Sequence, residues 1–271
     1  MKFVRTVLAI LATSASSLAF AAPITVDGQL NDWIGSPHAK AADWTPLRAT
    51  TVSSVEDQTG ALGTYLNPGY GGQSYDAEAM YVEQNGGVLN IAIVTGLRPN
   101  NPQNPSGNSY APGDILFDFN RDGTPDFGLV LTSTAGLKVG GLYAGTSWNV
   151  GLWSSPGVLA DASHPSPYEV AVRQGSLLGM TSEVYTSTAV TGLGAYGSDS
   201  HYVIEAAIPI ALFGSEWSRA MATGIDVSWS AYCANDIVQA TLMPHAVPEP
   251  GSLALAGLGL AGLLRLRRRK R

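Results

Sequence analysis

Apolar and polar residues alternate in short runs along most of the chain between residues 24 and 242. In residues 201–210, every second side chain from Tyr202 to Ile208 falls on one side, and His201 and Glu205 fall on the other. A period of two is that of a β-strand with one buried face. Alternation or short apolar runs predict ten strands: Ile24–Val26, Ala79–Glu83, Val88–Val94, Ile115–Phe119, Phe127–Leu131, Lys138–Tyr143, Tyr168–Arg173, His201–Ile210, Asp226–Ala231 and Ile237–Leu242.

Turn-forming residues separate these runs. The chain has 31 glycines and 16 prolines, and residues 85–87 (Asn-Gly-Gly) predict a hairpin turn between two strands. Only residues 210–213 and 216–222 favour a short helix. We therefore expect an all-β fold for residues 22–246, a single antiparallel β-sandwich with a jelly-roll-like arrangement.

The first 21 residues have the pattern of a secretory signal helix. Lys2 and Arg5 precede an apolar stretch, and Ala19-Phe20-Ala21 is a small-x-small cleavage site. The alternative is a buried N-terminal helix. The order of charge, apolar run and cleavage site favours export through the translocation machinery, followed by cleavage by signal peptidase.

Residues 247–271 have three parts in a fixed order. Pro248, Glu249 and Pro250 precede an uncharged run, and a basic cluster with Arg267, Arg268 and Arg269 ends the chain. A helix over residues 251–266 would anchor the chain in a thin inner membrane, with the basic cluster in the cytoplasm. An ordinary tail anchor is the alternative, although the apolar run is short for one.

These three parts together resemble the PEP-CTERM sorting signal. The resemblance implies recognition and processing by exosortase, an integral-membrane enzyme, in bacteria that produce exopolysaccharide. It also implies a transient membrane anchor, followed by display at the cell surface or release from the cell.

A second resemblance covers the body of the chain loosely. Residues 24–33, which end in Asp32-Trp33, look like the opening of β-sandwich modules similar to family 9 carbohydrate-binding modules, and residues 75–82 and 202–214 resemble later strands of those modules. The resemblance implies a β-sandwich with Trp33 in its core. Sugar binding does not follow from the fold alone.

The charge distribution excludes one class of partner. The formal charge of the whole chain is −6, but residues 23–247 contain seven basic and twenty acidic residues, a net charge of −13. Binding of nucleic acid requires clustered Lys and Arg to neutralise phosphates. We therefore expect no nucleic-acid partner.

An Asp-rich loop is the clearest candidate for a metal site. Oxygen-bearing side chains stand at positions 1, 3, 5 and 9 around a glycine at position 6, and these residues are Asp118, Asn120, Asp122, Asp126 and Gly123. This spacing is typical of a Ca²⁺ loop, but Leu129 stands where an EF-hand has its bidentate Glu. A polar hairpin turn without metal is the equal alternative.

Aromatic residues in predicted loops are candidates for sugar binding, because flat rings with polar edges suit sugar rings. The four candidates are Tyr70, Tyr75, Trp148 and Trp153. Packing in the core is the alternative for each of them.

Signatures of catalysis are absent from the sequence. It contains no Gly-x-Ser-x-Gly, no His-Glu-x-x-His and no Cys-x-x-Cys, and Cys233 is its single cysteine. A buried thiol is favoured over a nucleophile paired with His201. We expect a non-catalytic surface or extracellular-matrix protein that engages polysaccharide. The alternatives are a structural envelope protein without a ligand and a glycan-acting enzyme.

Overall fold

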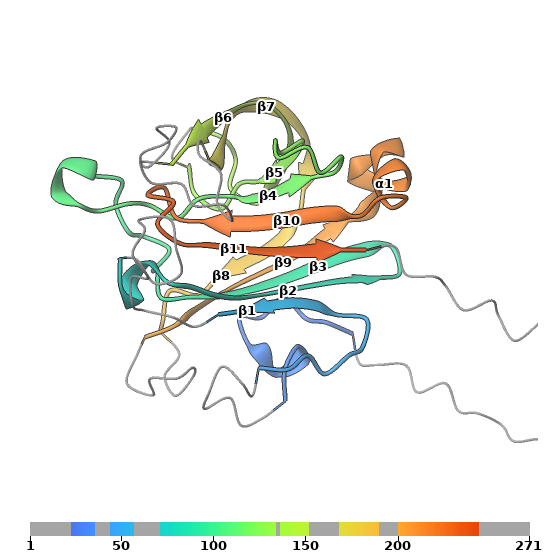
Figure 1. Cartoon of the computed structure of the whole chain (residues 1–271), viewed down its shortest axis with the longest axis horizontal. Coiled ribbons are helices and arrows are strands. Elements are labelled where there is room, and N and C mark those ends of the chain that lie inside the picture. The colour runs from blue at the N-terminus through green and yellow to red at the C-terminus, as the bar shows by residue number, and fades with distance from the viewer. Residues whose placement is uncertain are drawn as a thin grey trace, which may run out of the picture.

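The computed structural model describes residues 23–35, 44–56, 71–133, 136–151, 168–189 and 200–243. These residues form an all-β body with little helix (Figure 1). The strands are β1 (Val52–Val55), β2 (Ala77–Asn85), β3 (Val88–Thr95), β4 (Ile115–Asp118), β5 (Phe127–Leu129), β6 (Gly141–Val150), β7 (Glu169–Met180), β8 (Ser182–Tyr185), β9 (Tyr202–Pro209), β10 (Ile225–Ser230) and β11 (Ile237–Leu242).

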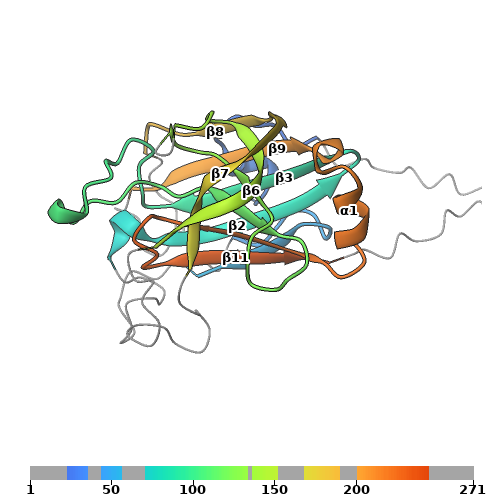
Figure 2. The same cartoon turned by 90° about the horizontal axis from the view of Figure 1, so that it is seen from above.

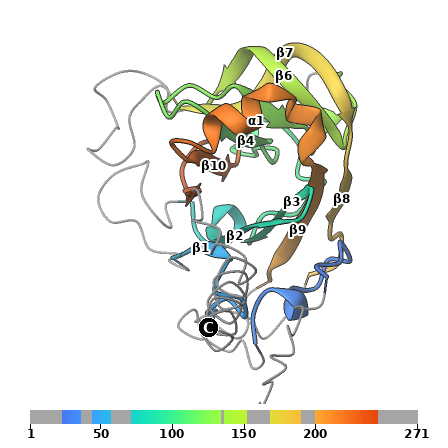
Figure 3. The same ribbon diagram turned by 90° about the vertical axis from the view of Figure 1, so that its right-hand side faces the viewer.

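The strands form two antiparallel sheets. The five-stranded sheet has the order β1-β2-β3-β9-β8, and the six-stranded sheet has the order β11-β10-β4-β5-β6-β7. Viewed from above, β6 and β7 lie across β2 and β3 (Figure 2). Seen from its end, the body shows the sheets facing each other, with the only α-helix of the described residues, α1 (Ser215–Ala220), at the near end (Figure 3). This arrangement confirms an all-β fold of two antiparallel sheets.

Short turns and a few helical turns connect the strands. The predicted hairpin is confirmed, because Asn85 pairs with Val88 and Gly86 takes a positive φ of 60° in the two-residue loop between them. The 3₁₀ turns are η1 (Leu30–Asp32), η3 (Gln73–Tyr75), η4 (Pro105–Gly107) and η6 (Ile210–Phe213). The predicted helix at residues 210–213 is thus a 3₁₀ turn, and α1 occupies part of the second predicted helix.

The main core fills the space between the two sheets. Met80 on β2 pairs with Ile93 on β3, which pairs with Ile204 on β9, and all three side chains are fully buried. Phe117, Leu129 and Val227 from the six-stranded sheet belong to the same cluster of buried residues. Burial of side chains of this size contributes about 1.5–3 kcal/mol each, so this layer is the principal source of stability.

A second core lies on the opposite face of the five-stranded sheet. Trp33 and Trp44 from the N-terminal segment pack with Tyr81, Ala92 and Val203 of β2, β3 and β9. Residues 23–35 and 44–51, called here the covering segment, therefore give this sheet a third layer. The strand predicted at residues 201–210 is confirmed, but its second face is also buried, since His201 and Glu205 are fully buried.

One predicted strand is absent, and two observed strands were not predicted. Residues 24–26 are not a strand, because the Thr25 N–H donates to the Asp32 carboxylate at 2.8 Å and not to a neighbouring strand. Strands β1 and β8 were not predicted, and each is a short edge strand whose position is set by its pairing with β2 or β9. The predicted helices of the secretory signal and the C-terminal tail lie outside the described residues. Within the described residues, no helix has the length and apolar character needed to cross a bilayer.

Candidate functional site

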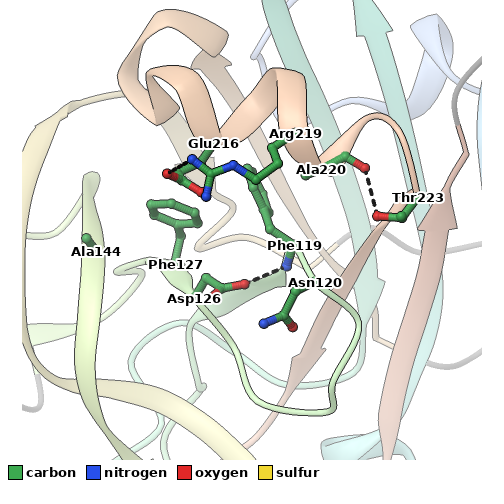
Figure 4. A pocket seen from close by; sticks show the side chains of 9 residues that line it. All are labelled: Phe119, Asn120, Asp126, Phe127, Ala144, Glu216, Arg219, Ala220 and Thr223. Atoms are coloured by element: carbon green, nitrogen blue, oxygen red, sulfur yellow. Dashed lines mark hydrogen bonds and ion pairs between the residues drawn. The ribbon is translucent and has the colours of Figure 1, made fainter.

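A pocket of about 490 Å³ opens between the Asp-rich loop and α1 (Figure 4). Residues 119–127 line one side and residues 216–223 the other, and Ala144 of β6 completes the lining. Its volume lies in the usual range for small-molecule pockets. The pocket therefore has the size of a site for a small ligand.

The floor of the pocket is aromatic. The ring centroids of Phe119 and Phe127 lie 4.7 Å apart, and Phe119 lies 4.9 Å from Phe213. Phe213 in turn stacks on Trp217 of α1, with centroids 5.7 Å apart. Phe119 and Phe127 line the pocket and are 5% and 7% exposed, and they pack on Phe213 and Trp217 of the core, which do not line it. Edge-to-face and offset aromatic contacts hold such rings in defined orientations.

The rim of the pocket is polar and partly charged. Arg219 and Glu216 form an ion pair at 2.9 Å along α1, with 72% and 43% of their side chains exposed. The Asp126 carboxylate accepts a hydrogen bond from the Phe119 N–H at 2.8 Å, and this bond joins the two ends of the loop. Asn120 and Thr223 complete the polar lining. These groups can donate and accept hydrogen bonds toward a ligand that sits on the phenylalanine rings.

The Asp-rich loop is held by hydrogen bonds from its own backbone. The Asp118 carboxylate accepts from the N–H groups of Arg121 at 2.6 Å and of Gly123 at 2.7 Å. Burial raises the pKa of Asp118, and these backbone donors oppose that rise. Asp122 bonds to Thr124 and to Asn120. The residues predicted to bind Ca²⁺ thus lie in one loop.

No His, Cys, Asp or Glu residues of the described ranges gather in threes around a point that would suit a metal. Calcium binding by Asp118, Asn120, Asp122 and Asp126 stays a prediction. The geometry of the loop fits a hairpin turn, in which Asx side chains bond to backbone N–H groups two to five residues on.

The aromatic candidates occupy different places. Trp148 is half-buried on β6, where its indole lies across Gly145, and a Cβ at that glycine would lie 2.2 Å from the ring. The Tyr75 hydroxyl accepts from the Tyr110 N–H at 3.1 Å and ties two loops together. Trp153 and Tyr70 lie outside the described residues. Of the two candidates that the structure describes, Trp148 lies on β6 and Tyr75 in η3, so they belong to different sheets or connections.

The pocket floor was not predicted from the sequence as a site. The signal available was that Phe119 and Phe127 bracket the Asp-rich loop. Nothing in the sequence joins that loop to Arg219, which comes from a helix about a hundred residues later. The approach of Arg219 to the loop depends on the turn between η6 and α1 at Gly214. The φ of Gly214 is 59°, a value that favours glycine.

Buried polar residues cluster away from the pocket, on the second face of the five-stranded sheet. His201 Nδ1 lies 2.6 Å from the Glu78 carboxylate, and the His201 ring packs edge-on against Trp44. The Glu205 carboxylate accepts from the indole N–H of Trp33 at 2.7 Å and from the backbone N–H groups of Asp27 and Gly28. These contacts fasten the covering segment to the sheet.

The pKa values of two buried acidic side chains are strongly raised. Burial raises the pKa of Glu56, just after β1, to about 9, helped by the charge of Asp236 and a hydrogen bond to it. Burial also raises the pKa of Asp114 to about 7, although its carboxylate accepts from the N–H groups of Leu131 and Val172. At neutral pH, Glu56 is therefore mostly neutral and Asp114 is close to half ionised in the folded protein.

Cys233 lies fully buried in the main core, as predicted for a structural thiol. Burial raises the pKa of this thiol to about 12. A thiol with this pKa is almost entirely protonated at neutral pH and is a poor nucleophile.

Comparison with known proteins identifies the C-terminal segment. Residues 246–270 match the family model of the PEP-CTERM protein-sorting motif. No curated protein matches the chain. The match indicates an exported protein that is processed at a membrane-anchored C-terminus and displayed at the cell surface, with exosortase as its processing partner. Nothing in the comparisons supports the resemblance to family 9 carbohydrate-binding modules.

Proposed function

We propose that the chain is a non-catalytic surface or matrix protein that binds polysaccharide in the pocket between the Asp-rich loop and α1. Residues 251–266 anchor it transiently in the inner membrane until exosortase acts, and the β body then reaches the cell surface or the extracellular space. The observation that carries the sugar-binding part is the pocket itself, in which a polar rim surrounds a fixed aromatic floor.

The chemistry of the pocket suits a sugar. The C–H faces of a pyranose pack on aromatic rings, and its hydroxyl groups bond to planar polar side chains. Phe119 and Phe127, of which 5% and 7% is exposed, supply a small apolar contact surface, and Asn120, Asp126 and Arg219 supply the polar groups. Because the floor is preorganised by the core, binding would cost little ordering of the protein.

Glycan binding by the exported protein tests this function. On an array of polysaccharides, Arg219→Ala is expected to weaken binding about tenfold, because a hydrogen bond to a charged group contributes about 1.5–3 kcal/mol. Arg98→Ala is the matched control. Arg98 is exposed just beyond the β3 end near Thr95, whereas α1 follows the opposite end of the sheet, where Val88 pairs with Pro209.

The remaining outcomes separate the alternatives. Absence of binding to any glycan, with and without calcium, would contradict the proposal and leave a structural role. Loss of the glycan over time would indicate an enzyme. Equal weakening by Arg219→Ala and Arg98→Ala would place the sugar outside the pocket.

A further inference from the structure

We propose that a second pocket, beyond the end of the five-stranded sheet opposite α1, binds a sugar acid through its carboxylate. The pocket has a volume of about 400 Å³, within the usual range for small-molecule sites. Its lining comes from three stretches that are distant in sequence: Ser74 and Tyr75 of η3, residues 96–98 and 101 after β3, and Ser200 and Tyr202 at the start of β9. At this end of the sheet Thr95 pairs with Tyr202, whereas α1 follows the end where Val88 pairs with Pro209. The site is separate from the pocket beside α1 and does not rest on the function proposed above.

The backbone at the floor of this second pocket is fixed by its neighbours. The Gly96 N–H donates to the Asp76 carbonyl at 3.0 Å, and the Tyr185 hydroxyl donates to the Leu97 carbonyl at 2.6 Å. Gly96 lies so close to η3 that a Cβ at this position would collide with the Gln73 carbonyl oxygen. The floor is therefore in place before a ligand arrives, which lowers the cost of binding.

Arg98 is the only charged residue among those that line the second pocket. Its Nε donates to the side-chain oxygen of Asn101 at 3.3 Å, and its two terminal amino groups make no hydrogen bond to any residue that the structure describes. The Asn101 amide is itself held, because it donates to the Tyr110 carbonyl at 2.7 Å and to the Tyr75 hydroxyl at 3.3 Å. Asn101 thus orients the guanidinium and leaves its terminal groups available to a ligand.

The charge of Arg98 is also available to an anion. Arg48, Arg121 and Arg219 each form an ion pair with an acidic side chain, at 3.8, 3.2 and 2.9 Å. Arg98 forms no ion pair with a residue of the described ranges, although residues 23–247 carry a net charge of −13. A guanidinium binds a carboxylate through two parallel hydrogen bonds, so a carboxylate is the anion that fits this side chain best.

Hydroxyl groups and aromatic rings surround this cation. The hydroxyls of Ser74, Ser200 and Tyr202 face the same pocket and form no hydrogen bond with another described residue. Tyr75 and Tyr202 are half-buried, and each presents a ring with a polar edge, which suits a sugar ring. A carboxylate at Arg98 together with several hydroxyl groups on one ring is the chemistry of a uronic acid.

Binding of D-glucuronate to the exported protein tests the proposal, with D-glucuronamide as the neutral analogue of the same shape. We expect a titration followed by NMR to give a dissociation constant of about 1 mM for glucuronate. Glucuronamide is expected to bind at least about tenfold more weakly, and Arg98→Ala should weaken glucuronate binding by a similar factor, because charge-assisted hydrogen bonds are about twice as strong as neutral ones. Arg173→Ala is the matched control, since Arg173 is also an exposed arginine and lies on β7, in the other sheet.

The outcomes separate this site from the pocket beside α1. Glucuronate binding that is lost in Arg98→Ala and kept in Arg173→Ala would support the proposal. No binding at about 20 mM glucuronate, equal binding of glucuronamide, or unchanged binding by Arg98→Ala would overturn it. Sulfate that binds at Arg98 as tightly as glucuronate would also overturn it, because the site would then recognise charge alone. Arg98→Ala stays the control for neutral glycans at the pocket beside α1, so either site can fail without the other.

A further measurement covers the case in which circular dichroism shows that Arg98→Ala does not fold. Glucuronate must then shift the backbone amide signals of residues 96–101 and 200–202 in the wild type. Shifts confined to other residues would overturn the proposal.

Discussion

The two sheets of this protein differ in how many of their faces are covered. The five-stranded sheet is buried on both faces, by the main core on one side and by the covering segment on the other. The six-stranded sheet is buried on its inner face, and its β6–β7 end carries exposed apolar residues. The comparison shows that a short irregular segment can turn one sheet into a middle layer, while its partner leaves apolar side chains of β6 and β7 exposed.

The largest expected difference between the two sheets is in the stability lost when one tryptophan is removed from each. Trp33→Ala removes a fully buried indole from the second core and leaves Glu205 without its indole donor, so we expect a loss of about 3–5 kcal/mol in the free energy of unfolding. Trp148→Ala is the counterpart on the six-stranded sheet, and its half-buried indole should contribute about 1–2 kcal/mol. Urea unfolding of both variants measures the difference. Equal losses would mean that the covering segment adds no more stability than the packing of Trp148 on β6.

The second prediction concerns pH, because each sheet is associated with a buried acid whose pKa is raised to about 7 or above. An acid with a raised pKa in the folded state stabilises the protein below its unfolded pKa, and that stability is lost as the pH rises through the folded pKa. The stabilising contribution of Asp114, just before β4, is lost as the pH rises to about 7. That of Glu56, after β1, is lost as the pH rises to about 9. The melting temperature should therefore fall from pH 5 to pH 9.

Glu56→Gln isolates the contribution of the five-stranded sheet. The amide stays neutral and can still donate a hydrogen bond to Asp236, so the fall in melting temperature between pH 7 and pH 9 should largely vanish, and the fall below pH 7 should persist. Circular dichroism melts at a series of pH values measure both parts. An unchanged slope above pH 7 would show that another group titrates there.

The smallest expected effect concerns calcium at the edge of the pocket. If the Asp-rich loop binds Ca²⁺, millimolar calcium raises the melting temperature by a few degrees, and Asp122→Ala abolishes the rise. Sodium chloride at matched ionic strength is the control for screening. A wild-type melting temperature that does not respond to calcium would leave the loop as a hairpin turn.

Alternation in the sequence predicted most strands of the main core, because residues such as Ile91 and Ile204 face it at every second position. It did not predict β1 or β8. In β1, Ser53 and Ser54 stand between two valines and leave no period of two, and its place is set by pairing with β2. Edge strands of this kind take their conformation from a neighbour that is distant in sequence.

The second core could not be predicted, because its polar members looked exposed. In residues 201–210, His201 and Glu205 suggested a face turned to water, yet both are buried with partners from other segments. The sequence does not distinguish a buried polar side chain that is fully hydrogen-bonded from an exposed one. The same limit applied to the pocket, whose walls at Phe119 and Arg219 meet only in the folded chain.

The attachment of the covering segment to Glu205 also has a consequence for the time course of export. The backbone N–H groups of Asp27 and Gly28 bind a carboxylate that lies 178 and 177 residues further along the chain. When the chain crosses the membrane with its amino end first, Trp33 arrives long before the strand that will bury it. The protein therefore completes its third layer only when nearly the whole body has been delivered, and such distant contacts make folding slow.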